Sequence, residues 1–375
     1  MRTVTEQPAT GIDESQLCVP GCRPERLARL ARTAVQRCQL DLTDLVVFTE
    51  AASGAYAVTP VLAALAGARR VYALGPSSES GSFEEIKQAT DALARIASVG
   101  DRIEVVSEKC RDIICQADIV TNSGHVRPID AEMVAAMKFS AVIPLMYEAW
   151  ELRTTDLDLT ACRERGIPIA GTNEQHPEID TFSFLGMMSI RLRLDAGIPV
   201  SQSRILVCSD NSFGPFLERG LSQSGAIVES VENLAARCGI WEADAVVIAM
   251  VPREQPVVGR REAELIAQFY PAAVVAQFWG DLDRFELRRC NVPFWPIQAP
   301  RPGHQAALPS SIGPDPVVRL QAGGLKVGEV MARSRLFQSN LKESSAAAVA
   351  AAVRSGFGQA VNAGVLGAPG RARAT

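Results

Sequence analysis

The sequence has no long apolar run, no strong charge of either sign and no apolar leader. No stretch reaches about 18 consecutive apolar residues, so no transmembrane helix is expected. The first residues, MRTVTEQPATGIDESQ, are polar and predict no secretory signal. The 38 basic and 42 acidic residues give a formal net charge of -4, which argues against a nucleic-acid-binding surface. We therefore expect a protein that binds neither membranes nor nucleic acids.

Cysteine is present, but not in a pattern that builds a site. The nine cysteines are an odd number without a C-x-x-C pair, and no cysteine–histidine cluster follows the two closest pairs. A disulfide scaffold is not expected in a chain of this length, and no metal site is predicted. Reduced cysteines that pack as small apolar residues are typical of a cytoplasmic protein, and this is the location we expect.

Short apolar runs alternate with helical patterns along most of the 375 residues, of which 47% are hydrophobic. A chain of this length suggests two domains. Strands are predicted at 45–48, 71–74, 103–106, 119–121, 141–145 and 167–170, with helices at 58–68, 83–96 and 130–137. Repeated strand–helix–strand units predict a parallel sheet with helices on both faces.

The alternation pauses at a long helical stretch, residues 176–194, and then resumes. Further strands are predicted at 204–208, 226–230, 245–250 and 272–277, with helices at 213–224 and 262–269. We predict an α/β protein with two Rossmann-like or flavodoxin-like doubly wound parallel-sheet domains and an interdomain cleft. The domains expected are a substrate domain at 13–185 and an NAD(P)-binding domain at 186–304. The C-terminal segment 305–370, loop signals and then an Ala-rich helix at 343–353, is expected to pack back on the first domain.

The chain has only three histidines, and all three lie beside Gly or Pro after a predicted strand: His125, His176 and His304. Ligands of open α/β sheets bind outside the carboxyl ends of the strands. Histidine is the side chain best suited to proton transfer near neutral pH. These positions favour an acid–base role for at least one of them, and the alternative for each is a helix cap or a surface hydrogen bond.

Charged residues accompany the histidines at the ends of these strands. Arg127 and Arg153 are candidates to hold a substrate carboxylate through a two-pronged contact. Glu148 is a candidate for a contact with the substrate or with its binding residues. Asp156 and Asp158, in RTTDLDL, are expected to be helix caps without a chemical role.

Two strand–turn–helix segments contain glycine and could cradle a phosphate: TEAASGAYAVTP and CSDNSFGPF. The second keeps only the last glycine of a G-x-G-x-x-G pattern, Gly214. Glu229, or Glu232 a little later, is expected at the end of the following strand, where it would accept hydrogen bonds from a ribose; Glu229 would favour NAD over NADP. An ordinary α/β turn without a ligand is the alternative. The residues predicted to hold a dinucleotide are Ser209, Asp210, Asn211, Ser212, Phe213, Gly214 and Glu229.

Three segments carry a resemblance to a known family: DLDLTACRERGIPIAGTN, HPEIDTFSFLGMM and EADAVVIAMVPREQPVVGRREAELIAQFYPAAVVAQ. The first resembles the D-x-x-x-x-R-G-I-x-V-x-N segment of the D-isomer-specific 2-hydroxyacid dehydrogenases. The second stands where that family has its interdomain helix, and the third is similar to the segment that leads to its catalytic arginine. The resemblance covers roughly residues 115–305. It implies two α/β domains, NAD or NADP as cofactor, a homodimer, and an acid–base role for His304.

The sequence departs from that family where its arginine should follow residues 272–277, because the chain reads FWGDL there, with Phe278 and Trp279. No glutamate partner of the histidine is found before Pro296, and LPSSIGPDPVVRLQAGGLKVGE differs from the usual tail. The predicted function is an NAD(P)-dependent oxidoreductase that moves hydride to or from a small anionic substrate in the cleft. The residues expected at the reacting site are His304, His125, Arg127 and Glu148.

The departures leave a second hypothesis. The chain could be a non-redox nucleotide- or ligand-binding protein, or a hydrolase or lyase, on the same two-domain fold. The first glycine-containing turn and the loop LGPSSESGS would then form its ligand site.

Overall fold

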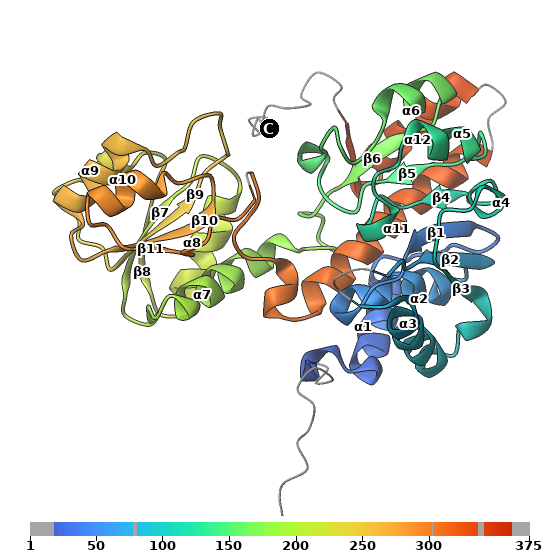
Figure 1. The fold of residues 1–375 in the computed structure, drawn as a ribbon, viewed down its shortest axis with the longest axis horizontal. Coiled ribbons are helices and arrows are strands. Elements are labelled where there is room, and N and C mark those ends of the chain that lie inside the picture. Colours follow the sequence, from blue (N-terminus) through green and yellow to red (C-terminus); the bar gives the residue numbers. More distant parts are fainter. Residues whose placement is uncertain (1–18, 78–80, 302, 337–340, 362–375) are drawn as a thin grey trace, which may run out of the picture.

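The computed structural model describes residues 19–77, 81–301, 303–336 and 341–361. The chain forms two α/β lobes, which Figure 1 shows with strands β7–β11 on the left and the remaining strands on the right. Residues 13–18 and 362–370 of the expected domains, and residues 78–80 of the loop LGPSSESGS, lie outside the described residues. None of the helices in the described part of the chain is long and apolar enough to cross a membrane.

The first half is built on a parallel sheet in the order β3-β2-β1-β4. Its strands are β1 (Val46–Glu50), β2 (Arg70–Leu74), β3 (Ile103–Val106) and β4 (Ile119–Val120). A parallel bridge between Ile119 and Val142 continues this sheet into a second group of strands. That group has the order β12-β6-β5, with β5 (Ile143–Pro144), β6 (Ile169–Thr172) and the antiparallel edge strand β12 (Gly358–Ala360).

Helices cover both faces of this sheet. Val47 packs with α1 (Pro24–Arg37), α2 (Val58–Leu65) and α3 (Phe83–Ala97). Phe48, the next residue of β1, packs on the other face with α4 (Arg111–Ile114), α5 (Ala131–Ala136) and α6 (Leu159–Arg165). Successive side chains of a strand point to opposite faces, and all five residues of β1 are buried. The apolar run at this position is therefore a central strand between two helical layers.

The chain returns to the first half through α11 (Asp315–Leu336) and α12 (Leu341–Arg354). Helix α11 packs against α1, α2 and β6 as well as α12. The expected Ala-rich helix is confirmed as α12. The loop predicted before it is wrong over α11, because glycine interrupts the helical pattern there and lowers helix propensity. The glycines serve close packing: a Cβ at 323, 324 or 328 would press into Ile179, Met146 or Ile119.

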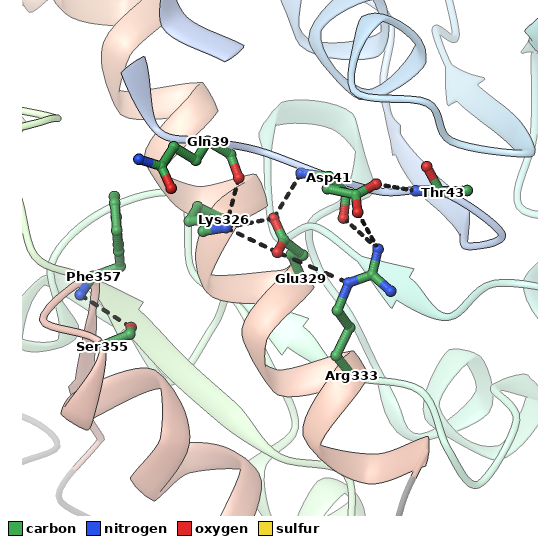
Figure 2. A network of polar contacts seen from close by, with 8 residues as sticks. All are labelled: Gln39, Asp41, Thr43, Lys326, Glu329, Arg333, Ser355 and Phe357. Carbon is green, nitrogen blue, oxygen red and sulfur yellow. Dashed lines mark hydrogen bonds and ion pairs between the residues drawn. The ribbon is translucent and has the colours of Figure 1, made fainter. Parts of the chain in front are cut away.

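A polar network fixes α11 to the segment before β1 (Figure 2). The Lys326 ammonium donates to the Gln39 carbonyl at 2.8 Å and pairs with Glu329 at 2.8 Å. Glu329 accepts the Asp41 backbone N–H at 2.9 Å, and Arg333 pairs with the Asp41 carboxylate at 3.1 Å. Backbone groups of the connection thus bond to side chains almost three hundred residues later, which ties the end of the chain to its beginning.

The second half has a five-stranded, wholly parallel sheet in the order β11-β10-β9-β7-β8. Its strands are β7 (Arg204–Cys208), β8 (Ile227–Val231), β9 (Ala245–Ala249), β10 (Val274–Trp279) and β11 (Phe294–Trp295). Helices α7 (Leu185–Asp195) and α8 (Phe213–Gln223) cover one face, and α9 (Arg260–Phe269) and α10 (Arg284–Arg289) the other. The strand order reverses between β7 and β9, where open α/β sheets bind ligands.

Each predicted strand overlaps an observed one, and the predicted class, α/β with two doubly wound parallel sheets, is confirmed. The predicted helix at 176–194 is wrong in its first part. Residues 176–181 form a turn in which His176 Nδ1 accepts the backbone N–H of Glu178, and Asp180 has a positive φ of 48°. A short 3-10 helix (Phe182–Phe184) precedes α7.

Candidate functional site

Polar residues gather where the strands of the first sheet end. Glu50 is the last residue of β1, and Asn122 and Ser123 follow β4. Tyr147 and Glu148 follow β5, and Glu174 follows β6. The carboxyl ends of parallel strands meet at one edge of the sheet, so these residues face a common region.

Glu50 is a buried carboxyl group without a hydrogen bond. Its residue is 5% exposed, and it accepts no hydrogen bond from any described residue. Burial raises the pKa of Glu50 to about 7, against the opposite effect of the positive charge of Arg127. The carboxyl group lies against Gly124, where a Cβ would overlap it. Gly124 (φ +35°) therefore leaves the space that Glu50 occupies.

Three further glutamates lie close together at the ends of β5 and β6. Burial and then the charge of Glu148 raise the pKa of Glu151 to about 7. Burial and the charges of Glu151 and Glu148 raise the pKa of Glu174 well above its ordinary value. The pKa of Glu148 is also raised by burial, although it accepts hydrogen bonds from the Trp150 indole and from Gln359. Like charges so close together favour the protonated form of at least some of these groups.

Tyr56 belongs to the same cluster. It lies in the 3-10 helix Gly54–Ala57 that follows β1, and its hydroxyl makes no hydrogen bond with a described residue. Burial, followed by the negative charges of Glu50 and Glu174, raises the pKa of Tyr56. A neutral phenol beside these carboxyl groups can donate a hydrogen bond to a ligand.

Two arginines and a histidine add positive charge to this region. Arg127 pairs with Asp156 at 3.6 Å, and Asp156 also accepts a hydrogen bond from the Tyr147 hydroxyl at 2.7 Å. Arg153, an exposed side chain of the first half, lies 3.4 Å from Nδ1 of His304, which comes from beyond the last strand of the second half. Burial and the charges of Arg153 and Arg301 lower the pKa of His304, which keeps its imidazole neutral near pH 7.

An aromatic cluster joins the two halves beside these charged groups. Trp150, from the first half, lies 4.9 Å from Trp279 at the end of β10, centroid to centroid, and 6.3 Å from Phe213, the first residue of α8. Trp279 is 4% exposed and donates its indole N–H to the Gly303 carbonyl at 3.0 Å, next to His304. The rings therefore hold the end of β10, the start of α8 and the His304 loop against the first half.

The turn between β7 and α8 has the position expected of a dinucleotide site. Asn211 accepts the Phe213 N–H at 2.9 Å and donates to the Ala249 carbonyl at 2.7 Å. Asp210 accepts the Val251 N–H at 2.8 Å and pairs with Arg253 at 2.9 Å. The Asp210 and Asn211 side chains thus join the ends of β7 and β9. They accept the backbone N–H groups of Val251 and Phe213, which a glycine-rich turn would leave free to bind a pyrophosphate.

Other features of this turn fit a phosphate. Ser209 and Ser212 are small, and a Cβ at Gly214 would lie 3.3 Å from Ser209, so the start of α8 packs closely on the end of β7. The side chain of Arg253 is 61% exposed beside the turn. The residues that fit a dinucleotide are therefore Ser209, Ser212, Gly214 and Arg253, and Asp210 and Asn211 are those that do not.

The structure brings some of the predicted site residues together. His304 lies against Arg153, and the positive charge of Arg127 also helps to lower its pKa. Glu148 belongs to the glutamate cluster, and the residues from Ser209 to Ser212 form the turn that leads into α8 at Phe213 and Gly214. His125 lies next to Gly124 in the 3-10 helix Gly124–Val126, with a partly exposed side chain.

Other predicted placements are wrong. Glu229 lies within β8, opposite Leu206 of β7, and pairs with Arg237 at 3.1 Å, because the strand ends at Val231 and not at residue 230. It is not at the strand end, where a ribose would lie. The predicted alternative, Glu232, is the first residue beyond that end. Asp158 caps α6 as expected, but Asp156 binds Tyr147 and Arg127 instead of capping a helix.

The third histidine lies against the C-terminal return of the chain. The His176 ring stacks on Phe357 with 3.8 Å between the ring centroids. Its Nδ1 accepts the backbone N–H of Glu178 at 3.2 Å, within the turn that follows β6. His176 therefore supports the packing of the returning segment on the first half.

Glu50, Tyr56 and Trp150 are not among the site residues that the sequence predicts. Glu50 had a readable signal, since it is the first carboxylate after the apolar run LVVF and stands at a strand end. Tyr56 and Trp150 have no such signal, because only the fold shows what they face.

Comparisons with known proteins support the fold. No family model matches the sequence, and no curated protein matches it. The structure is similar to a dipicolinate synthase chain from Bacillus subtilis (10% identity, TM-score 0.50, 79% of this chain and 99% of that chain). It is also similar to the corresponding dipicolinate synthase chain from Bacillus halodurans (11% identity, TM-score 0.51, 76% and 98%). These likenesses show the two-domain α/β fold, which agrees with the fold that the family resemblance implies.

A NAD-dependent formate dehydrogenase from Staphylococcus aureus, solved with NAD, is similar at 12% identity and a TM-score of 0.45, over 68% of this chain and 92% of that chain. A likeness of this size adds nothing to the assignment of the fold.

Proposed function

We propose that the chain is an NAD(P)-dependent oxidoreductase that acts on a small anionic substrate at the boundary between its halves. One observation carries the proposal: His304 of the second half meets Arg153 of the first half at 3.4 Å, beside Arg127. Two guanidinium groups can bind a carboxylate, and a neutral imidazole next to them can take a proton from a hydroxyl group of the same substrate.

The roles follow from these positions. Arg153 is exposed and carries no carboxylate partner among the described residues, so it is the group freest to bind a substrate anion. Arg127 is held by Asp156 and Tyr147, which fixes its direction. The lowered pKa of His304 makes it a proton acceptor at neutral pH. Glu148 positions Trp150 through the indole N–H and so supports the aromatic contact between the halves.

A nicotinamide dinucleotide, when bound, supplies the hydride donor or acceptor. Ser209, Ser212, Gly214 and Arg253 are the residues proposed to hold its phosphates at the turn between β7 and α8. Trp279 and Phe213 form the apolar wall on the side of His304. Whether NAD or NADP is preferred depends on the end of β8, where the exposed Glu232 would repel a 2′-phosphate.

A second candidate is a non-redox protein that binds a ligand in the first half. The bonds of Asp210 and Asn211 across the ends of β7 and β9 favour it, because they complete the turn without a cofactor. The first glycine-containing turn is a poor phosphate site in this case, since the Glu50 carboxyl group lies at its start and would repel an anion once it is ionised.

Titration with NADH and NADPH, followed by the fluorescence of the four tryptophans, separates the two candidates. The oxidoreductase predicts quenching at micromolar cofactor and weaker binding in Arg253→Ala. Arg260→Ala, an exposed arginine on α9, is the matched control and should bind as the wild type does. The His304→Ala variant should bind the cofactor and lose turnover. If neither cofactor binds, or if His304→Ala turns over normally, the oxidoreductase proposal is wrong.

A further inference from the structure

The C-terminal strand β12 carries a side chain that reaches the segment after β5. Gln359 is the middle residue of β12 and lies level with Gly171 of β6. Its Oε1 accepts the backbone N–H of Ala149 at 2.9 Å, and its Nε2 donates to Oε1 of Glu148 at 3.0 Å. The returning end of the chain therefore holds two successive residues that follow β5.

Gly171 leaves the space for this contact. Residues directly opposite each other in an antiparallel pair have their side chains on one face of the sheet, and Gly171 has none. A Cβ at Gly171 would overlap the backbone of Ala149. The backbone of Ala149 therefore packs directly on β6, within reach of the Gln359 amide.

The two hydrogen bonds require an amide at position 359. The backbone N–H of Ala149 can only donate, so the side-chain oxygen of Gln359 lies on its side and the nitrogen lies toward Glu148. A second carboxyl group would face Glu148 instead of donating to it, and an apolar side chain would make neither bond. Glu148 is 4% exposed, so bulk water does not replace a lost partner.

Glu148 links Gln359 to the aromatic cluster between the halves. Its Oε2 accepts the indole N–H of Trp150. The Trp150 ring lies 4.9 Å from Trp279 and 6.3 Å from Phe213, centroid to centroid, and both partners belong to the second half. The two oxygens of one buried carboxyl group thus bind the C-terminal strand and the ring that contacts the other half.

Further contacts extend from these rings to the His304 loop. Trp279 donates its indole N–H to the Gly303 carbonyl at 3.0 Å, one residue before His304. The backbone N–H of Ala306 donates to the Phe278 carbonyl at 3.0 Å. The loop is therefore fixed to the end of β10, and the end of β10 meets the first half through the rings.

Strand β12 keeps its place by contacts other than the Gln359 side chain. Its backbone pairs with β6. Asn173 donates its backbone N–H to the Phe357 carbonyl at 2.8 Å and its Nδ2 to the Gly356 carbonyl at 2.9 Å. The Phe357 ring also stacks on His176. A substitution of Gln359 therefore tests the side chain without removing the strand.

We propose that Gln359 is a positioning residue: it holds Glu148, which orients the Trp150 ring against the end of β10 and so sets how the two halves meet. The effect on the contact between the halves stands on these contacts alone. The effect on turnover rests on the proposed function, which needs His304 beside a substrate held by Arg153.

The test follows the two neighbouring indoles in solution. Trp150 and Trp279 are close enough to give an exciton couplet in the circular dichroism spectrum, and Trp150→Phe gives the spectrum without it. Acrylamide quenching of the tryptophan fluorescence is measured alongside, since Trp279 is 4% exposed while the rings are in contact. Gln359→Met keeps a side chain of similar length without the two hydrogen bonds. We expect it to lose most of the couplet and to be quenched more strongly, whereas Gln88→Met, at an exposed glutamine of α3, should match the wild type.

An exchange of two side chains separates positioning from a general effect on β12. Gln359→Glu keeps an oxygen for the Ala149 N–H but faces Glu148 with a second carboxyl group, so the couplet should weaken as the pH rises and both groups ionise. Adding Glu148→Gln restores a complementary pair. The amide oxygen at position 148 can accept the Trp150 indole N–H, and the amide nitrogen can donate to the carboxylate at position 359. The double variant should regain most of the couplet at every pH.

Two outcomes overturn the proposal. Either Gln359→Met and Gln359→Glu keep the couplet and the quenching of the wild type, or the double variant is no better than Gln359→Glu alone. Far-UV circular dichroism shows that the variants are folded. The couplet requires no cofactor, so its loss in Gln359→Met together with no binding of NADH or NADPH would keep the positioning role and remove the oxidoreductase. An unchanged couplet with normal cofactor binding would do the opposite.

Discussion

The two sheets differ in how the polar residues at their carboxyl ends are bonded. At the end of β7, Asp210 and Asn211 bond to backbone groups of Val251, Ala249 and Phe213. At the ends of β1 and β4, Glu50 and the Asn122 amide nitrogen are buried without a partner among the described residues. A buried polar group without a partner costs free energy that a ligand can restore. The first half therefore has buried polar groups that lack a partner among the described residues, whereas the polar side chains of the β7–α8 turn are already hydrogen-bonded.

The largest effect is expected from the substitution of Glu50, the buried carboxyl group at the end of β1. Its folded pKa of about 7 lies above the ordinary 4.5, so the unfolded chain loses this proton first and the wild type loses stability as the pH rises between these values. At 1.36 kcal/mol per pKa unit the loss reaches about 3 kcal/mol above pH 7. Glu50→Gln should therefore raise the free energy of unfolding by up to about 3 kcal/mol at alkaline pH and change it little below the ordinary value. Denaturant unfolding across this pH range measures the difference. A pH-independent difference would show that Glu50 is not held in a raised-pKa state.

The second prediction concerns the space beside Gly124 that the Glu50 carboxyl group occupies. Gly124→Ala places a Cβ where the Glu50 carboxyl group lies, at a positive φ, and should destabilise the protein by about 2 kcal/mol. The double variant Gly124→Ala with Glu50→Ala removes the overlap and should recover part of the loss. Thermal denaturation of the single and double variants checks this. Purely additive losses would mean that the two residues do not touch.

The contact between the halves is tested at Trp150. Trp150→Ala removes two ring contacts and the indole donor to Glu148, and should cost about 1–2 kcal/mol. Trp150→Phe keeps a ring and should lose less. Near-ultraviolet circular dichroism should change in Trp150→Ala because Trp279 loses its neighbour. Unchanged stability in both variants would indicate that the rings do not join the halves in solution.

The smallest effect is expected in the second half, from the substitution of Asp210 in the turn between β7 and α8. Asp210→Asn removes the negative charge at the turn but keeps a side-chain oxygen for the Val251 N–H. It also releases Arg253 from its ion pair, which is worth little at such an exposed position. NADH should bind about threefold more tightly, measured by tryptophan fluorescence. Weaker binding would mean that Asp210 holds the cofactor.

The sequence predicted the strands well because buried parallel strands are short apolar runs, such as VVF in β1 and AVVIA in β9. It did not predict α11, since Gly323, Gly324 and Gly328 interrupt a helical pattern for the sake of tertiary packing. A shift of one residue in β8 moved Glu229 from the end of the strand to its interior. Element type was thus readable from local pattern, whereas boundaries depended on pairing between strands.

For the site, the loop position of His304 and the nearby Arg127 and Arg153 were readable, because chemistry in α/β folds gathers after strands. The bonding state of Glu50 was not, since burial and the lack of a partner are properties of the folded neighbourhood. The same holds for Asp210, whose bonds to Val251 and Arg253 join loops about forty residues apart.

The polar contacts of Lys326, Glu329 and Arg333 with the segment at Asp41 can form only after the C-terminal part of the chain has left the ribosome. Since α11 packs against α1, α2 and β6, the half that is made first cannot finish until the part made last has emerged. The strands from β7 to β11 form a contiguous unit that can mature earlier. In nascent chains truncated before Asp315, the domain of strands β7 to β11 should therefore resist protease, while the domain of strands β1 to β4 is still cleaved.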